Sequence, residues 1–229
     1  MLVLRLILPF FLSISVLAAS DTGSKTIVHS VSVKQMKFLR FVDQKYQKKY
    51  GIHIELKKVI TLGMLGSTKE SSGQAWLAKG KMRLEMQKPS ASKMVADGQY
   101  LWIESPPPED FEGGKTQVLR ASLSSDRAKS QGLIQLLTGG GVLKFFKVSG
   151  IQEDKEQITY FLQPDKQAVE FKRAQLKVSK KSADIVEIRY WDQMDNETAY
   201  IFEKTNFEQK LDGKLFSYKP PKDAEVITY

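Results

Sequence analysis

The residues from 81 to 105 alternate between apolar and polar side chains in a pattern that only β-strands accommodate. A two-residue period places one set of side chains on each face of a strand. The apolar set of the first strand is Met82, Leu84 and Met86. Asp97-Gly98 then indicates a turn into the β-rich run Tyr100–Ile103. We therefore expect two short strands joined by a turn here, and most of the remaining chain repeats this pattern.

The N-terminus has the order of a secretory signal peptide. One cation, Arg5, precedes an apolar run from Leu6 to Leu17, and the small residues Ala18-Ala19-Ser20 follow it. This order predicts cleavage near Ala18 to Ser20. The apolar run is shorter than the roughly 20 residues of a membrane span. We expect residues 1–20 to be removed and residues 21–229 to form a single exported domain.

Composition excludes several classes of function. The chain of 229 residues contains no cysteine, so disulfides, thiol catalysis and the lipid anchor of a lipoprotein are all excluded. The formal net charge is +9, but the basic residues are dispersed and alternation along strands would solvate most of them. We expect no nucleic-acid partner, and at most a transient attraction to anionic membrane surfaces.

Two helices are predicted among the strands. Apolar residues recur at helical spacing between Val28 and Tyr50, with Gly51 predicted as a left-handed cap. A helix lying across a sheet is favoured over a peripheral membrane helix. A second apolar helix is predicted after Ser124 or Ser125, and Gly139-Gly140-Gly141 ends it as a hinge or cap.

The remaining pattern predicts strands. A turn is expected over 69–73, a break at Lys79-Gly80-Lys81, and a last strand over 214–218 that ends at two prolines. We count about ten or eleven strands in one domain, which is too large a sheet to remain flat. The fold class is α+β, mostly β.

No arrangement of residues typical of an enzyme is present. The two histidines, His29 and His53, have no partners at ligand spacing, so we expect neither a metal nor another cofactor. Gly113-Gly114-Lys115-Thr116 is similar to the end of a phosphate loop, but Glu109 occupies the place of its first glycine. We expect no catalytic residues.

Four ordered motifs resemble the periplasmic outer-membrane lipoprotein carrier proteins (LolA-type). They are Gln74-Ala-Trp76-Leu, Met82-Arg-Leu-Glu-Met, Val95-Ala-Asp-Gly-Gln-Tyr-Leu-Trp102-Ile-Glu and the C-terminal Leu215-Phe216-Ser-Tyr218-Lys-Pro220-Pro221 with Val226. Residues 130–138 are similar to the lid helix of that family. The resemblance covers essentially the whole chain after the signal peptide.

The resemblance implies a fold and a role. The expected fold is an incomplete, half-open antiparallel barrel with helices covering its concave side. The expected monomer would bind the acyl chains of lipoproteins in a hydrophobic cavity. It would receive them from an inner-membrane release complex, an ABC transporter, and deliver them to an outer-membrane receptor. The residues expected to line the cavity are Trp76, Met82, Leu84, Met86, Trp102, Leu133, Ile134, Leu136, Leu137 and Phe216.

One stretch departs from the family pattern. An Arg-Pro pair that latches the lid usually follows the tryptophan strand, whereas this chain has Lys79-Gly80-Lys81 there. Lysine lacks the bidentate fork of arginine, so a latch built on it would be weaker or different. Two alternatives stay open. The chain could bind another lipid or a glycolipid on the same open barrel, or regulate an envelope-stress response by sensing lipids.

Overall fold

The computed structural model describes residues 29–47, 51–87, 89, 91–107, 113–125, 141–165, 171–208 and 210–229. The predicted signal peptide, residues 1–20, lies outside these residues. The predicted second helix, including residues 130–138 and the lid of the family resemblance, lies outside them as well.

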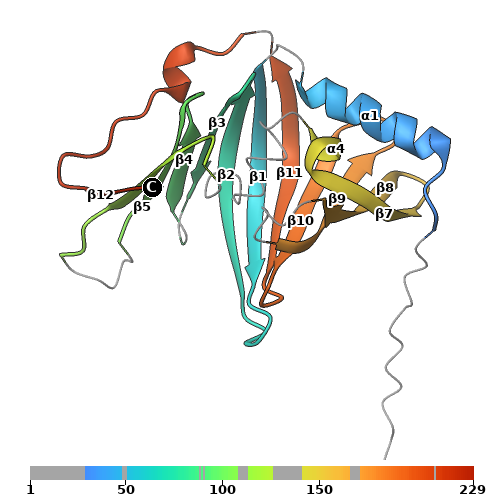
Figure 1. Cartoon of the computed structure of the whole chain (residues 1–229), viewed down its shortest axis with the longest axis horizontal. Coiled ribbons are helices and arrows are strands. Elements are labelled where there is room, and N and C mark those ends of the chain that lie inside the picture. Colours follow the sequence, from blue (N-terminus) through green and yellow to red (C-terminus); the bar gives the residue numbers. More distant parts are fainter. Residues whose placement is uncertain are drawn as a thin grey trace, which may run out of the picture.

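One large curved sheet dominates the described part of the chain (Figure 1). Its strands are β1 (Gly51–Thr61), β2 (Thr68–Ala78), β3 (Lys81–Met86), β4 (Ser92–Ala96), β5 (Tyr100–Ser105), β6 (Gln117–Ser122), β7 (Phe146–Glu153), β8 (Gln157–Pro164), β9 (Phe171–Ser179), β10 (Ile185–Asp192), β11 (Glu197–Glu208) and β12 (Glu225–Thr228). The helices in the described residues are α1 (Val33–Gln47), α4 (Val142–Phe145) and the short 3₁₀ helix η1 (Gly213–Phe216).

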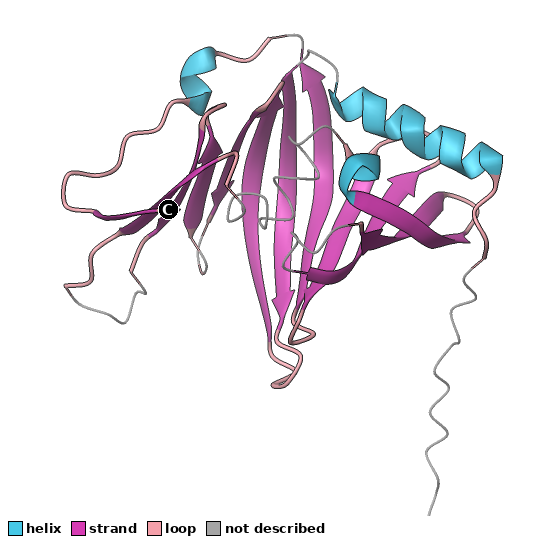
Figure 2. Cartoon of the chain, in the orientation of Figure 1, coloured by secondary structure: helices cyan, strands magenta, loops and turns pink. Residues whose placement is uncertain are grey.

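The sheet is open. Its strand order is β12-β6-β5-β4-β3-β2-β1-β11-β10-β9-β8-β7, so β12 and β7 form the two edges in the described residues. All neighbours are antiparallel except β12, which pairs in parallel with β6. The expectation of a mostly β fold with an open, unclosed sheet is confirmed. The parallel edge strand was not expected, and it depends on the C-terminal segment crossing the sheet before it pairs (Figure 2).

Helix α1 packs on one face of the sheet, which we call the helix face. Its buried side chains Leu39, Val42 and Tyr46 recur at helical spacing, as the sequence predicts. They belong to the same apolar cluster as Ile54 of β1 and Leu84 of β3. Ser32 precedes the helix and its hydroxyl accepts a hydrogen bond from the backbone N–H of Gln35 at 3.3 Å, as an N-cap does.

Several predicted boundaries are wrong. Gly51 begins β1 and is not among the glycines with positive φ, so it is not a left-handed cap. The turn predicted over 69–73 belongs to strand β2, and the chain turns instead at residues 62–67, where Gly66 has φ 61°. The break at Lys79-Gly80-Lys81 is confirmed as the β2–β3 turn, with φ 70° at Gly80.

Two further segments differ from the prediction. Residues 81–105 form three strands because the short β4 intervenes, and Asp97-Gly98 turns β4 into β5. The predicted last strand over 214–218 is η1 followed by extended chain, and β12 comes after the two prolines. The prolines cannot donate to a ladder, so pairing resumes only beyond them.

Candidate functional site

The helix face of β1 to β6 is continuously apolar. Directly paired residues of neighbouring strands point to the same side of a sheet, so the register defines its rows. One row is Ile54, Ala75, Leu84, Met94, Ile103 and Leu119. The next row is Ile52, Leu77, Met82, Ala96, Leu101 and Ala121. The two rows give an apolar surface six strands wide.

Strand β3 contributes three residues that lie next to one another on this surface. Met82, Leu84 and Met86 are exposed by 0%, 3% and 5%. Gly73 of β2 pairs with Met86, and a Cβ at that glycine would collide with the Met86 side chain and the Glu85 carbonyl. The glycine therefore gives the flexible thioether its space. These three predicted site residues lie together, as the alternation indicates.

The two tryptophans predicted to line the cavity, Trp76 and Trp102, lie on the opposite face of the sheet. Trp76 stacks on His53, with ring centroids 5.2 Å apart, and the indole N–H of Trp102 donates to Asp97 at 3.0 Å. Their register partners on this face are Arg83 and Val95. The structure therefore does not bring the tryptophans together with the methionines. In β2 the odd-numbered residues face the helix, whereas in β3 the even-numbered residues do. Trp76 and Met82 therefore point to opposite sides of the sheet although both numbers are even.

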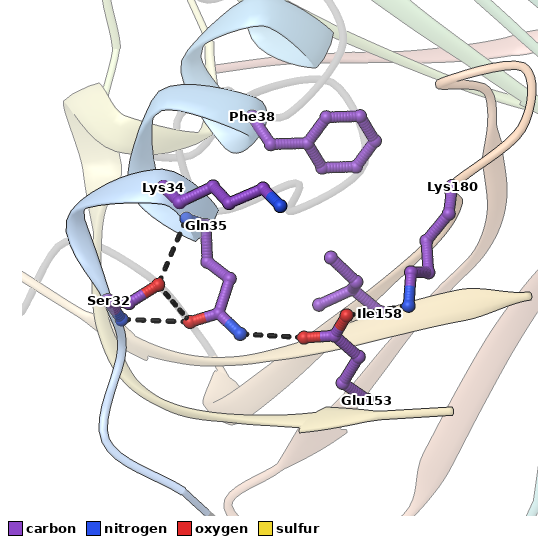
Figure 3. Close-up of a pocket in the computed structure, with 7 residues that line it drawn as sticks. All are labelled: Ser32, Lys34, Gln35, Phe38, Glu153, Ile158 and Lys180. Atoms are coloured by element: carbon purple, nitrogen blue, oxygen red, sulfur yellow. Dashed lines mark hydrogen bonds and ion pairs between the residues drawn. The ribbon is translucent and has the colours of Figure 1, made fainter. Parts of the chain in front are cut away.

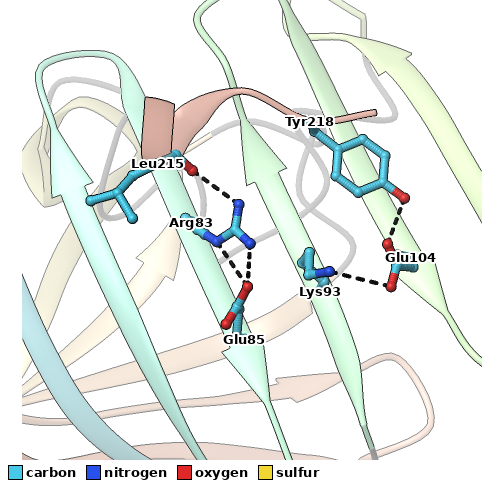
Figure 4. Close-up of polar contacts among 6 residues, drawn as sticks. All are labelled: Arg83, Glu85, Lys93, Glu104, Leu215 and Tyr218. Atoms are coloured by element: carbon cyan, nitrogen blue, oxygen red, sulfur yellow. Dashed lines mark hydrogen bonds and ion pairs between the residues drawn. The ribbon is translucent and has the colours of Figure 1, made fainter. Parts of the chain in front are cut away.

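The C-terminal segment covers the opposite face of β3 to β5, and we call residues 211–224 the strap (Figure 4). Tyr218 packs against Trp102 with ring centroids 5.4 Å apart, and its hydroxyl donates to the Glu104 carboxylate at 2.7 Å. Phe216 is 3% exposed but is not a member of the helix-face cluster. The strap thus places this predicted site residue apart from the methionines.

Arg83, the only arginine of β3, also binds the strap. Arg83 donates from Nη1 to the carbonyl of Leu215 at 3.0 Å and from Nε to Glu85 at 2.8 Å (Figure 4). It therefore points away from the helix face. The predicted site residues Leu133, Ile134, Leu136 and Leu137 lie outside the described residues.

A cavity of about 410 Å³ opens at the start of α1 (Figure 3). Its lining residues are Ser32, Lys34, Gln35, Phe38, Glu153, Ile158 and Lys180. Glu153 accepts a hydrogen bond from Gln35 at 2.7 Å and pairs with Lys180 at 2.6 Å. These two partners hold the pKa of the Glu153 carboxyl below its ordinary value. The lining thus combines the charged side chains of Lys34, Glu153 and Lys180 with the apolar Phe38 and Ile158.

Lys58 is a candidate site residue that the sequence does not single out. Lys57 and Lys58 both look like solvated cations of a strand, but they point to opposite faces. Lys57 pairs with Glu203 at 3.2 Å and Glu70 at 3.5 Å. Lys58 shares the helix face with its register partner Tyr200, whose ring centroid lies 5.7 Å from the ammonium. Burial lowers the pKa of Lys58.

Two negative observations concern the described residues only. No group of three or more histidine, cysteine, aspartate or glutamate residues there could hold a metal ion. No helix in the described ranges is both long and apolar enough to cross a membrane.

The sequence of this chain is similar to those of known proteins. The family “Outer membrane lipoprotein carrier protein LolA” matches residues 48–219. A protein of Chromobacterium violaceum named outer-membrane lipoprotein carrier protein is 28% identical over 167 residues, covering 71% of this chain and 75% of that protein. A protein of Legionella pneumophila with the same name is 28% identical over 162 residues, covering 70% of this chain and 74% of its own.

Similar solved structures have low sequence identity to this chain. An uncharacterized conserved protein from Thermus thermophilus has a TM-score of 0.48 at 12% identity and covers 85% of this chain and 99% of its own. A LolA superfamily protein from Nitrosomonas europaea has a TM-score of 0.45 at 10% identity, with coverage of 80% and 97%. The family match extends over well more than half of the sequence, from the residues just before β1 to the strap. The chain therefore belongs to the LolA family of outer membrane lipoprotein carrier proteins.

Proposed function

We propose that this protein is a periplasmic carrier that binds the acyl chains of lipoproteins and moves them from the inner to the outer membrane. The observation that carries the proposal is the family match over residues 48–219. The names of the curated relatives support it. In this role the protein binds and releases cargo without making bonds and without a cofactor, and it acts as a monomer.

The chemistry of the helix face supports the same role. An acyl chain of ~15 methylenes requires about 12 kcal/mol to enter water, at ~0.8 kcal/mol for each methylene. A carrier must offset most of this cost and still release the chain. The methionines Met82, Met86 and Met94 of the helix face are unbranched and polarizable, so they adapt to chains of varying shape.

The proposed partners follow from the transfer of lipoproteins from the inner to the outer membrane. The carrier takes its cargo from an inner-membrane release complex of the ABC transporter class and passes it to an outer-membrane receptor. The signal peptide at residues 1–20 would direct it to the periplasm and be removed there. The net positive charge favours brief contact with anionic membrane surfaces.

Photo-crosslinking from two neighbouring residues of β4 tests the proposal. Met94 points to the helix face and Lys93 to the opposite face, where it lies 3.5 Å from Glu104. A benzophenone amino acid is placed at either position in the protein without residues 1–20. Each variant is incubated with inner-membrane vesicles that contain a labelled lipoprotein and the release complex.

We expect a soluble one-to-one crosslinked product from position 94 and little from position 93. Equal crosslinking from both positions would place the cargo elsewhere. No soluble complex from either variant, with both folded by circular dichroism, would reject the carrier role. Mass spectrometry of the bound ligand separates lipoprotein from another lipid or a glycolipid.

A further inference from the structure

Lys58 is a cation without a hydrogen bond or ion pair among the described residues, and it lies on the mostly apolar helix face. Its neighbour on that face, Leu56, is 2% exposed and belongs to the apolar cluster. Within the described residues, Lys58 forms no hydrogen bond and no ion pair, and its one polar contact is with the face of the Tyr200 ring. Lys58 is partly buried, and even partial removal of an ammonium from water is unfavourable when no partner compensates for it. A purely structural role would be better served by an apolar residue.

The adjacent lysine shows what a structural cation looks like in the same strand. Lys57 lies on the opposite face between two carboxylates, Glu203 and Glu70, and these raise its pKa. Lys58 has the reverse shift, caused by burial alone. The two neighbours thus differ in a property that a ligand site requires, because Lys58 is a donor left without a partner among the described residues.

The surroundings of Lys58 offer a second donor and an apolar track. Its register partner on β2 is Ser71, which is 5% exposed, and no hydrogen bond of the Ser71 hydroxyl is found in the described part of the chain. The next helix-face row contains Leu56, Gly73 and Met86. From Lys58 to Ile52 the helix face of β1 runs for about 20 Å at ~3.3 Å per residue.

We propose that Lys58, with Ser71 beside it, binds the carbonyl oxygens at the polar end of a fatty acyl chain. The methylenes then lie along the apolar rows that begin at Leu56 and Met86. This inference rests on the proposed function and adds to it a fixed end for the cargo. The oxygens could belong to the carboxylate of a free fatty acid or to an ester-linked acyl group, and both are acceptors for a lysine donor.

The test compares three ligands with the same tail: hexadecanoate, methyl hexadecanoate and hexadecanol. Their binding is measured by displacement of the neutral dye N-phenyl-1-naphthylamine from the protein without residues 1–20. The variants are Lys58→Met, which keeps the unbranched stem, and Lys58→Arg, which keeps a charged donor. Lys57→Met is the matched control in the same strand.

We expect Lys58→Met to bind hexadecanoate roughly tenfold more weakly, since one charge-assisted hydrogen bond is lost. Lys58→Arg and Lys57→Met should bind it nearly as the unmodified protein does. Hexadecanol binding should be unchanged in all variants. A parallel loss for methyl hexadecanoate would identify ester-linked acyl groups as ligands, and a loss for hexadecanoate alone would identify the free acid.

Two results would overturn the inference, and they differ in what else they reject. If the unmodified protein binds all three ligands and Lys58→Met binds hexadecanoate equally well, the polar subsite is wrong and the carrier role stands. If the unmodified protein binds none of the three, the carrier role is rejected together with the subsite. A hexadecanol loss as large as the hexadecanoate loss would also reject the subsite, because it would indicate damage to the apolar track.

Discussion

The carboxylate of Asp43 in α1 accepts a hydrogen bond of 2.8 Å from the backbone N–H of Val142, the first residue of α4. The contact joins two segments 99 residues apart in the sequence. Gly141, with φ 104°, precedes Val142, and a Cβ there would collide with the carboxylate. A side chain of the first helix thus leaves no room for a Cβ at Gly141, one of the three glycines that the sequence predicts as a hinge or cap.

Removing the charge of Asp43 should change how stability depends on pH. Burial raises the pKa of this carboxyl although Val142 and other donors lower it. The folded state therefore gains a proton more readily than the unfolded state, and stability is lost as pH rises from the ordinary value of 3.8 through the raised pKa. Relative to the unmodified protein, Asp43→Asn should become more stable across this window.

Urea unfolding at pH 3.5 and at pH 7 measures this difference. The exposed Asp223→Asn serves as the control for loss of a negative charge. A stability difference between Asp43→Asn and the unmodified protein that stays constant over the whole range would contradict the prediction.

Glu187 should show the opposite dependence. Burial would raise the pKa of this carboxyl, but Arg189 at 2.7 Å and Lys177 at 3.2 Å hold it below 4.5. The unfolded state then binds protons first, so the stability that Glu187 contributes is present above pH 4.5 and is lost as pH falls through the depressed pKa. Glu187→Gln should be less stable than the unmodified protein at pH 7.

The deficit of Glu187→Gln should shrink in acid. Thermal unfolding followed by circular dichroism between pH 7 and pH 3 measures it, with Glu203→Gln as the exposed control. An equal deficit at both ends of the range would show that the carboxylate charge is unimportant there.

The strap should be stabilised by the contact between Tyr218 and Glu104. The hydroxyl donates to a partly buried carboxylate at 2.7 Å, and a hydrogen bond to a charged group contributes about 1.5 kcal/mol or more. Tyr218→Phe should lower the free energy of unfolding by about that amount. A double-mutant cycle with Glu104→Gln isolates the pair, and a coupling energy near zero would show that the strap is held by its other contacts.

Lys58→Met should stabilise the fold even as it weakens the proposed binding. The variant removes an ammonium that lacks a partner in the described residues, a gain of roughly 1 kcal/mol or more. Because burial lowers the pKa of Lys58, the gain is full below that pKa and shrinks as pH rises toward 10.5. Lys57→Met should instead be neutral or slightly destabilising, since exposed ion pairs contribute little.

Urea unfolding at pH 7 and pH 10.5 compares the two variants. A destabilised Lys58→Met at pH 7 would mean that the lysine has a structural partner. Retention of an unfavourable residue is typical of positions kept for function.

The sequence alone predicts those helices and strands whose side-chain periodicity is complete within the element itself. The alternation around Met82 and Met86 predicts strand β3, and the spacing of Leu39 and Val42 predicts helix α1. The break at Gly80 is also predicted correctly, whereas the left-handed cap predicted at Gly51 is not. These signals depend on side-chain periodicity and backbone sterics, which a sequence shows directly.

The sequence predicts the candidate site only in part, because periodicity is a property of one strand at a time. Alternation tells which residues of one strand share a face, but it does not relate one strand to the next. Trp76 and Met82 therefore looked like members of one lining although they point to opposite sides. Lys58 looked like its neighbour Lys57 because composition does not say which face of β1 is covered.

The sequence by itself determined a mostly β chain with an amphipathic first helix, because period and turn chemistry are local properties. The tertiary structure decided which face of each strand is covered. Strand register transmits the orientation of β1 across the sheet to β6, and helix α1 and the strap then cover opposite sides. The partial burial of Lys58 beside Tyr200 is a product of that long-range pairing, so only the folded sheet reveals it.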